Sequence, residues 1–560
     1  MHITYSSKVG RFVIDCDFTE NKLIAALPER RFMKRTKKWH APALSRNSRF
    51  LVDNLSKHMD QLALDKAHET LNRSQVRRVP FPAWYDFKTE PFPHQSEGLD
   101  HVWGLDRHAL FMYMGTGKTK MAIDFMSAKM VSGKADAWVV FCPDGVVPVW
   151  VEDEVPTHCP IRVEVVPLRG LSKAQARRAV QKAQDAERFV LVVPYDSIKQ
   201  KEKQGTAFDT LVQALNGRTY GVSVDESHKC KNPDANTSKN VEFVSEHARF
   251  AQIMTGTPTS KGYEDLYQQF RLLDPNIVGL NDFFAFKNRY CVKGGFENRE
   301  IVGYQNLDEL MGLINPYVFQ CTEEEANVQL PETTWTRRVV QLTSKQRRVY
   351  KEIDSKKRTE NEGAELVVDQ VLQKYSALQQ VVGGFFNYDE EQGEDEDTVR
   401  RTSWVLEPKD NPKVQEVLNV LQERPRSQVI VWCKFRNEIA QLKEVLGDQA
   451  VEYHGGVDPE ERERQKQRFR EGKARVFLSN ELGQEGITLN EADVTVYFSN
   501  SFKYVQRVQT QKRNHRSGQT KNVLYIDLVA EGTVDEDVLE SLQAKKDVAR
   551  FVEENMSKTG

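Results

Sequence analysis

The chain has 560 residues, a net charge of −2 at pH 7, 39% hydrophobic residues and 29% charged residues. This length is too great for one hydrophobic core and predicts about three or four soluble globular domains. No apolar run approaches the ~20 residues that span a membrane. The opening stretch MHITYSSKVGRFVIDCDF lacks the pattern of a secretion signal. Because the chain is nearly neutral, nucleic acid would have to bind to a local basic patch.

Seven cysteines are scattered along the chain, and none belongs to a C-x-x-C pair. This spacing argues against a zinc site and against a disulfide framework. We therefore expect a protein of a reducing cytoplasm.

Residues 1–88 are expected to form a small α+β module. GRFVIDCDF and KLIAAL alternate as strands do, and a helical pattern runs from about 47 to 70. Between them, Leu27 to Phe50 contains eight Lys or Arg residues and one acid. This stretch is either a solvated charge run or a DNA contact. In the second case Lys37 and Lys38 would meet phosphates and Trp39 would stack on a base, although Trp39 also suits a small core.

From about residue 93, short apolar strands alternate with helical segments, which predicts a parallel sheet with crossover helices. The alternation stops between about 260 and 410, where the pattern is mostly helical, and then resumes. The acidic run from Asp389 to Asp397 is interpreted as a disordered or solvated loop. The predicted domains are therefore 1–88, a first lobe at 89–330, a helical insertion and linker at 331–410, and a second lobe at 411–560.

The stretch LFMYMGTGKTKMAIDFM, from Leu110 to Met126, has the composition of a phosphate-binding loop between a strand and a helix. Such a loop needs small residues so that backbone N–H groups turn inward, a lysine for the terminal phosphates, and a hydroxyl for Mg²⁺. Met112 stands where the usual pattern has a small residue. The residues expected to surround the phosphates are Met114, Gly115, Thr116, Gly117, Lys118 and Thr119.

An apolar strand in YGVSVDESH ends at Asp225 and Glu226, about a hundred residues after the loop. A phosphate-loop hydrolase needs one acid next to Mg²⁺ and one to polarise the attacking water. We expect Asp225 with Thr119 to hold Mg²⁺, and Glu226 to act on water. Together with the loop, this pair predicts ATP and Mg²⁺ as the cofactors.

Several blocks resemble, in order, the motifs of the Swi/Snf-like DNA translocase branch of superfamily-two helicases. They are PFPHQSEGLDHVW, WVVFCPDGVVPVW, DESHKCKN, MTGTPTSKGYEDLYQQFRLLDP, EYHGGVDPEERERQ, VFLSNELGQEGITL and QTQKRNHRSGQ. The resemblance covers about 92–540. It implies two RecA-like parallel-sheet lobes with a helical insertion between them, after the small N-terminal domain.

The resemblance also implies roles for individual residues. Gln95 would read adenine, and Gln509, Arg513 and Arg516 would act on the phosphates from the second lobe. The R-x-x-R spacing predicts that the two arginines share one helix face. Residues expected to contact DNA or to couple the lobes are Pro143, Lys231, Asn232, Thr255 and Thr257. Gly483, Gly486 and Thr488 match the family's fifth motif, which links the DNA backbone to the nucleotide pocket, and Gly486 is expected to help bind the nucleotide.

Some residues depart from the family pattern. Met112 and Tyr113 replace acidic residues, and the fifth motif reads GQEGITL. FQCTEEEANVQLPE lacks the paired arginines that often precede Leu-Pro. These departures argue against nucleosome remodelling and favour a bacterial or phage DNA translocase. ERRFMKRTKKWHAPA weakly resembles the domain that precedes the motor in HARP-type annealing helicases.

The resemblance implies an enzyme that couples ATP hydrolysis to movement on double-stranded or forked DNA, for remodelling, branch migration or annealing. We expect it to work in the cytoplasm of a bacterial or phage-infected cell, without a membrane. A strand-separating helicase is the first alternative. Such a helicase needs a structural wedge that splits the two strands. No motif in the sequence indicates a wedge, although the long segment 276–305 could contain one. The second alternative is the motor subunit of a complex, which would be silent until a protein partner binds. An RNA helicase usually has D-E-A-D, and a non-enzymatic scaffold would lack the lysine, acids or arginines that are all present here.

Overall fold

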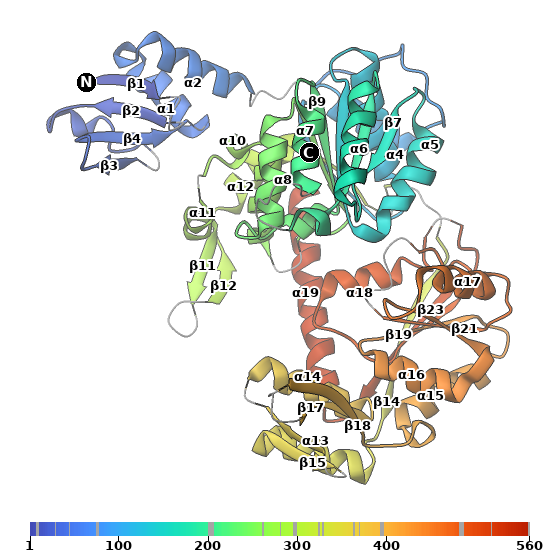
Figure 1. The fold of residues 1–560 in the computed structure, drawn as a ribbon. Coiled ribbons are helices and arrows are strands. Elements are labelled where there is room, and N and C mark those ends of the chain that lie inside the picture. The colour runs from blue at the N-terminus through green and yellow to red at the C-terminus, as the bar shows by residue number, and fades with distance from the viewer. Residues whose placement is uncertain are drawn as a thin grey trace. The chain divides into compact units, whose positions relative to one another are not determined.

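The structure is a computed structural model. It describes residues 1–6, 11–27, 30–43, 45–73, 78–199, 207–259, 262–280, 282–294, 300–322, 325–326, 330–361, 364–368, 370–392, 397–480, 487–516 and 518–557. The chain divides into two compact units (Figure 1). The first is Met1–Asn327 with Val548–Gly560, and the second is Val328–Asp547.

The first unit begins with a four-stranded antiparallel sheet of order β1-β2-β4-β3. Its strands are β1 (His2–Ser6), β2 (Arg11–Asp15), β3 (Arg31–Met33) and β4 (Lys38–Pro42). Helices α1 (Ser45–Leu55) and α2 (Gln61–Arg73) follow. Apolar residues that alternate along β1 and β2 pack with those of α1 and α2 in one small core, which includes Ile3, Phe12, Ile14 and Leu51.

The main sheet of the first unit is a seven-stranded parallel sheet of order β13-β5-β10-β9-β6-β8-β7. Several strands are buried at every residue because helices cover both faces, as expected of a parallel sheet. The strands are β5 (Arg107–Met112), β6 (Ala137–Cys142), β7 (Glu164–Pro167), β8 (Phe189–Pro194), β9 (Tyr220–Asp225), β10 (Phe250–Thr255) and β13 (Val318–Cys321). The helices are α3 (Pro93–Val102), α4 (Lys118–Val131), α5 (Val155–His158), α6 (Lys173–Asp185), α7 (Ala207–Leu215), α8 (Asn236–His247) and α9 (Leu266–Leu273).

Between β10 and β13 the first unit adds helices and a two-stranded antiparallel ribbon, β11 (Cys291–Gly294) with β12 (Glu300–Tyr304). Figure 1 shows the ribbon extending beyond the helices next to it. These helices are α10 (Pro275–Val278), α11 (Phe283–Tyr290) and α12 (Leu307–Ile314).

The second unit contains a six-stranded parallel sheet of order β14-β23-β22-β19-β21-β20. Its first strand, β14 (Thr333–Val340), pairs with β23 (Val523–Ala530), so the sheet includes residues before the expected start at 411. The other strands are β19 (Val429–Cys433), β20 (Ala450–Tyr453), β21 (Val476–Asn480) and β22 (Val494–Tyr497). Its helices are α15 (Pro412–Glu423), α16 (Arg436–Leu446), α17 (Pro459–Arg470), α18 (Tyr504–Gln511) and the first part of α19 (Val534–Ser557), whose residues from Val548 onward belong to the first unit.

The region expected to be helical contains helices α13 (Ser344–Lys356) and α14 (Val371–Val382), but it also contains two hairpins. They are β15 (Arg358–Asn361) with β16 (Ala364–Val367), and β17 (Phe385–Gln392) with β18 (Asp397–Trp404). The loop predicted at Asp389 to Asp397 is therefore wrong for its described residues, because Asp389–Gln392 belong to β17. Asp389 faces Arg400 across the pair, and Glu390 forms an ion pair with Arg401. Opposite charges across two strands stabilise a hairpin that the acidic run alone does not reveal.

Among the helices in the described part of the chain, none has the length and apolar composition needed to span a membrane.

Candidate nucleotide-hydrolysis site

The loop between β5 and α4 has the geometry of a phosphate cradle. Gly115 and Gly117 have φ angles of 84° and 83°, which glycine adopts without strain. Gly117 is the N-cap of α4, and the helix begins at Lys118. A helix N-terminus presents unpaired N–H groups and a positive dipole, and both favour a phosphate.

Lys118 is held by its own loop. Its Nζ donates to the backbone carbonyl oxygens of Met112 (3.0 Å) and Tyr113 (3.1 Å). Thr116 Oγ1 also donates to the Tyr113 carbonyl, at 2.7 Å. Met112 and Tyr113 thus contact Lys118 through backbone atoms that any residue type supplies. Thr119 follows on the first turn of α4.

Gln95 supports the loop from α3. The residue is 1% exposed, its Oε1 accepts from Phe92 N at 2.9 Å, and its Nε2 donates to Thr116 O at 3.0 Å. A Cβ added at Gly117 would lie 2.1 Å from Gln95 Nε2, so only glycine permits this approach. His94, which the sequence reading did not select, also reaches Thr116 O, at 2.8 Å from Nε2.

The acidic pair lies at the end of β9. Asp225 Oδ2 accepts from Trp150 Nε1 at 3.1 Å, and the Asp225 carbonyl accepts from Tyr195 OH at 2.5 Å. Asp225 is beside Met254 of β10, which in turn is beside Leu110 of β5. The acids and the phosphate loop therefore emerge at the same edge of one sheet. This is the edge at which open parallel sheets bind ligands.

The pKa values of the Asp225 and Glu226 carboxyl groups are shifted in opposite directions. Burial and the neighbouring Glu226 charge raise the pKa of Asp225. Burial also opposes ionisation of Glu226, but the hydrogen bond and charge of His228 outweigh it and lower the pKa of Glu226. Glu226 has a left-handed backbone with φ 52°, a strained conformation for a residue with a side chain. An ionised Glu226 suits a group that polarises water.

A polar chain joins this acid to the next motif within the same unit. His228 Nδ1 lies 3.3 Å from Glu226 Oε2 and 3.0 Å from Thr255 Oγ1. Thr255 Oγ1 donates to Glu226 Oε2 at 3.3 Å and accepts from Thr257 N at 3.1 Å. Between these threonines, a Cβ on Gly256 would lie 2.9 Å from Met114 Cγ of the phosphate loop. The segment Thr255–Thr257 is therefore in contact with both the phosphate loop and Glu226.

The other expected contacts of the first unit have structural partners here. Lys231 Nζ donates to Asp265 Oδ2 at 3.1 Å, and exposed Asn232 accepts from Asp234 N at 3.0 Å. Pro143 is buried at the end of β6 and precedes a short 3-10 turn.

Two arginines expected to act on phosphate lie after α18 and not on it. The helix ends at Gln511, so the prediction that Arg513 and Arg516 share a helix face is wrong. The segment is held in a turn, because Leu489 N donates to Arg513 O at 2.7 Å and Gln519 Nε2 donates to Asn514 O at 2.8 Å.

The same two side chains contact the segment of the fifth motif that follows residue 486. Arg513 donates to Ile487 O at 3.2 Å, and Arg516 donates to Thr488 Oγ1 at 2.8 Å. Gly483 and Gly486 lie outside the described residues. Gln509 is buried, with 6% of the residue exposed.

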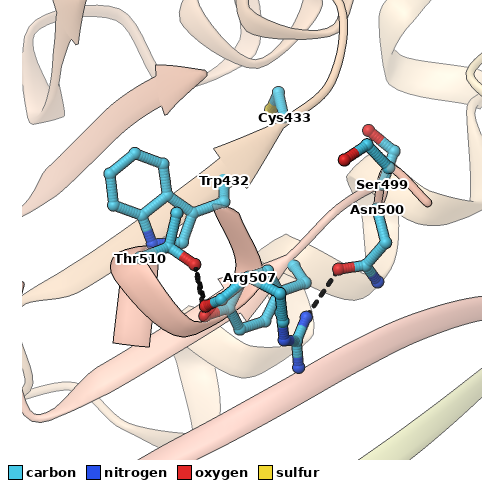
Figure 2. Close-up of a pocket in the computed structure, with 8 residues that line it drawn as sticks. Trp432, Cys433, Ser499, Asn500, Arg507 and Thr510 are labelled. Carbon is cyan, nitrogen blue, oxygen red and sulfur yellow. Dashed lines mark hydrogen bonds between the residues drawn. The ribbon is translucent and has the colours of Figure 1, made fainter. Parts of the chain in front are cut away.

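A pocket at the carboxyl ends of β19 and β22 contains Arg507, which was not predicted as a site residue from the sequence (Figure 2). Arg507 forms a bidentate ion pair with Asp527, at 2.8 Å for both contacts, and donates to Asn500 Oδ1 at 2.6 Å. Its guanidinium lies 3.1 Å from the centre of the Tyr497 ring. This buried network fixes α18 on the sheet and so positions the arginines beyond its end. The position of Arg507 before the block QTQKRNHRSGQ gave no signal of this role.

In the N-terminal module, Lys38 pairs with Asp15 at 2.8 Å, while Lys37 is exposed in the β3–β4 turn. Trp39 donates from Nε1 to Asn21 Oδ1 at 2.8 Å, and its ring packs edge-on against Phe32 at 5.3 Å. Trp39 is half-buried and packs against the small core of this module, as the core alternative expects.

The residues present fit Mg²⁺ bound with a nucleotide. In the part of the chain that the structure describes, no three metal-ligating side chains cluster. Mg²⁺ in nucleotide hydrolases needs only one or two protein oxygens, because phosphates and water complete its shell. Thr119 Oγ1 and the Asp225 carboxylate are the oxygens that would supply them.

A glycine-rich loop, an acid pair on the same sheet edge and a second parallel sheet with arginines define a two-lobed nucleoside triphosphate hydrolase. The SNF2-related domain matches residues 94–383, and the helicase conserved C-terminal domain matches residues 412–518. The chain belongs to the SNF2-related family of superfamily-two helicases and is an ATP-hydrolysing enzyme.

Two curated relatives show the range of the similarity. The uncharacterized ATP-dependent helicase YqhH of Bacillus subtilis is 24% identical over 479 residues, which cover 81% of this chain and 78% of YqhH. The CHD3-type chromatin-remodeling factor PICKLE of Arabidopsis thaliana is 22% identical over 486 residues, but this chain spans only 33% of PICKLE. The SWI2/SNF2 ATPase core of Sulfolobus solfataricus in complex with dsDNA is 18% identical, with coverage of 84% and 94% and a TM-score of 0.36.

Proposed function

We propose that this protein is a motor that uses ATP and Mg²⁺ to move along double-stranded or forked DNA. The observation that carries the proposal is the contact of Thr255 with both Glu226 and His228. The Thr255 hydroxyl donates a hydrogen bond to Glu226, the acid proposed to act on water beside the nucleotide. Thr255 also precedes, in the chain, the segment that leads to α9. A change at the nucleotide is thereby transmitted within the first unit, as a motor requires.

The proposed roles follow from the chemistry of each group. Mg²⁺, held by Thr119 and Asp225 with the phosphates, would neutralise charge on ATP. Lys118 exchanges its carbonyl partners for the terminal phosphates, and Glu226 polarises the attacking water. Arg513 and Arg516 would supply positive charge that stabilises the transition state of phosphate transfer. Gln95 holds the loop and reads adenine.

DNA is the proposed partner because the two family models that match are the SNF2-related domain and the helicase conserved C-terminal domain, and because the relative YqhH is named an ATP-dependent helicase. Contacts to the phosphate backbone would make binding independent of sequence and sensitive to salt. The exposed β3–β4 hairpin, with Arg31, Lys34, Arg35 and Lys37, is proposed as an accessory contact. The cell compartment that fits is the cytoplasm of a bacterial or phage-infected cell.

A triplex-displacement assay tests the proposal. A third strand bound to blunt duplex DNA should be released by the wild-type protein with ATP and Mg²⁺, and not by Lys118→Ala. Lys173→Ala, at an exposed lysine of α6, serves as the matched control and should behave as wild type. Wild-type protein that hydrolyses ATP with duplex DNA but never releases the third strand would contradict movement along DNA. ATP hydrolysis that is stimulated only by a protein partner would favour the alternative of a motor subunit in a larger complex.

A further inference from the structure

We propose that Trp150 is a positioning residue that fixes the Asp225 carboxylate for Mg²⁺. The indole Nε1 of Trp150 donates to Asp225 Oδ2 at 3.1 Å. Trp150 was not among the site residues predicted from the sequence. This inference rests on the proposed Mg²⁺ site, because Asp225 is one of its two proposed protein ligands. It assigns a residue that acts on the metal through Asp225.

The order of the parallel sheet brings Trp150 to the acid. Strand β6 lies next to β9, and Phe141 of β6 is beside Val224, the residue before Asp225. Because the two strands run in the same direction, the segments that follow them begin at the same edge of the sheet. Trp150 belongs to the segment after β6. It therefore reaches Asp225 from an adjacent strand, independently of the phosphate loop.

The backbone of Trp150 is fixed by an unusual turn. Residues Val149–Glu154 form a π-helix, in which Trp150 O accepts from Val155 N. Such turns are rare, and many of them occur at functional sites. Trp150 is also buried, with 1% of the residue exposed. The close packing of a protein interior therefore holds the indole donor in one place.

A second residue holds the backbone of the same acid. Tyr195 follows β8, which lies on the other side of β6, and its OH donates to Asp225 O at 2.5 Å. Tyr195 is 4% exposed. The main chain and the carboxylate of Asp225 are thus fixed by two different buried aromatic residues.

The hydrogen bond from Trp150 sets the orientation of the carboxylate. The terminal torsion of an aspartate side chain has only a weak preference, so the plane of the group depends on its partners. Among the described residues, no other side chain donates to the Asp225 carboxylate. A carboxylate accepts through both oxygens, so a donor on Oδ2 leaves Oδ1 for Mg²⁺. Hydrogen bonds of this kind orient the carboxylates that bind metals.

A buried indole N–H needs an acceptor for stability alone, and Trp138 provides the comparison that separates the two roles. Trp138 of β6 is 0% exposed and donates from Nε1 to Ser223 Oγ at 2.7 Å. Ser223 lies on β9, as Asp225 does. The two tryptophans thus make the same kind of bond to the same strand, but only the bond from Trp150 reaches a proposed metal ligand.

The test is the affinity of the full chain for a fluorescent, non-hydrolysable ATP analogue, measured in Mg²⁺ and in EDTA. Trp150→Phe keeps an aromatic ring and removes the N–H donor. Its affinity in Mg²⁺ should fall about 10-fold or more, because loss of a residue that orients a metal ligand weakens metal binding about 10–100-fold. Its affinity in EDTA should stay within about twofold of wild type. Trp138→Phe is the matched control and should keep wild-type affinity in both conditions.

Two further variants make the result decisive. Replacement of Trp150 by benzothienylalanine keeps the shape of the side chain and puts sulfur in place of the N–H. It should repeat the loss in Mg²⁺, and it decides the question if Trp150→Phe does not fold. Asp225→Asn removes the charge of the proposed ligand and should abolish the tightening by Mg²⁺.

The proposed Mg²⁺ site and the role of Trp150 fail in different ways. If Asp225→Asn keeps the tightening by Mg²⁺, or if wild-type protein shows none, the site itself is wrong. If Asp225→Asn loses the tightening, three results would still overturn the role of Trp150. They are wild-type affinity in Mg²⁺ for the folded Trp150 variants, an equal loss in Mg²⁺ and EDTA, and the same Mg²⁺-specific loss in Trp138→Phe.

Discussion

The Thr255 hydroxyl lies between two residues of the acidic motif, 3.0 Å from His228 Nδ1 and 3.3 Å from Glu226 Oε2. Thr255 is completely buried at the end of β10, and its Oγ1 also accepts from Thr257 N. One hydroxyl thus joins the acid that acts on water to the segment that leads into α9. Its loss should uncouple hydrolysis from DNA more than it impairs hydrolysis itself.

Thr255→Val tests this coupling, because valine keeps the shape of threonine and removes the hydroxyl. We expect basal ATP hydrolysis within about threefold of wild type and at least about a 10-fold loss of stimulation by duplex DNA. Thr495→Val is the control. The Thr495 hydroxyl is buried without a hydrogen-bond partner among the described residues, so its removal should not affect stimulation. Equal loss of basal and stimulated rates in Thr255→Val would contradict a coupling role.

Arg516→Ala tests the contribution of the second unit. ATP binding, measured with a fluorescent analogue, should remain within about threefold of wild type. The hydrolysis rate should fall about 10²–10³-fold, since an arginine that reaches the phosphates stabilises transition-state charge. The control is Arg464→Ala on α17, where 72% of the side chain is exposed. If Arg516→Ala hydrolysed ATP at the wild-type rate, the role of Arg516 would be limited to its hydrogen bond with Thr488.

Glu438 should make stability depend on pH. It is fully buried in α16, where burial raises the pKa of its carboxyl group to about 6 despite hydrogen bonds from Ser499 and from Phe435 N. Because the folded state holds this proton more tightly, the stability that it contributes is present below pH ~4.5 and is lost as pH rises through about 6.

Glu438→Gln should therefore be more stable than wild type by ~2 kcal/mol at pH 8, from a pKa shift of ~1.5 units. The difference in melting temperature should disappear near pH 4.5. Glu444→Gln, at an exposed position of the same helix, should show no such trend. A destabilised Glu438→Gln at pH 8 would mean that the carboxylate is needed for its interactions with Ser499 and Lys413.

The salt dependence of DNA binding tests the N-terminal hairpin. Lys34→Ala/Arg35→Ala/Lys37→Asn removes three exposed charges, and asparagine tolerates the positive φ of residue 37. The slope of log K against log salt for duplex DNA should become shallower by about 2–3, close to 0.9 per lost phosphate contact. Removal of three exposed charges from α6, at Lys173, Arg177 and Arg178, should leave the slope unchanged. Equal slopes for both triple variants would exclude the hairpin as a contact.

Sequence alone predicted the parts of the site that depend on short local patterns. The glycines at 115 and 117 have the positive φ angles that a phosphate cradle needs, and β9 ends at the predicted acids. These features follow from steric limits on glycine and from the alternation of strands and helices. The family resemblance likewise led to the two parallel sheets.

Features set by tertiary contacts were not predictable in the same way. The R-x-x-R spacing suits a helix, but the bond from Leu489 N to Arg513 O holds the segment in a turn. In the sequence Arg507 is one of many basic residues. Only its ion pair with Asp527 shows that it positions α18. The ribbon β11–β12 and the hairpin β17–β18 depend on cross-strand pairs, which polar segments do not reveal before the strands meet.

The most direct test of the central claim is steady-state ATP hydrolysis measured in parallel with no nucleic acid, duplex DNA, forked DNA, single-stranded DNA and RNA, with Lys118→Ala as the blank. A motor on duplex or forked DNA predicts stimulation of about 10-fold or more by those two DNAs, little by RNA, and no activity in Lys118→Ala. Stimulation by RNA or single strands alone, or wild-type activity in Lys118→Ala, would contradict the account.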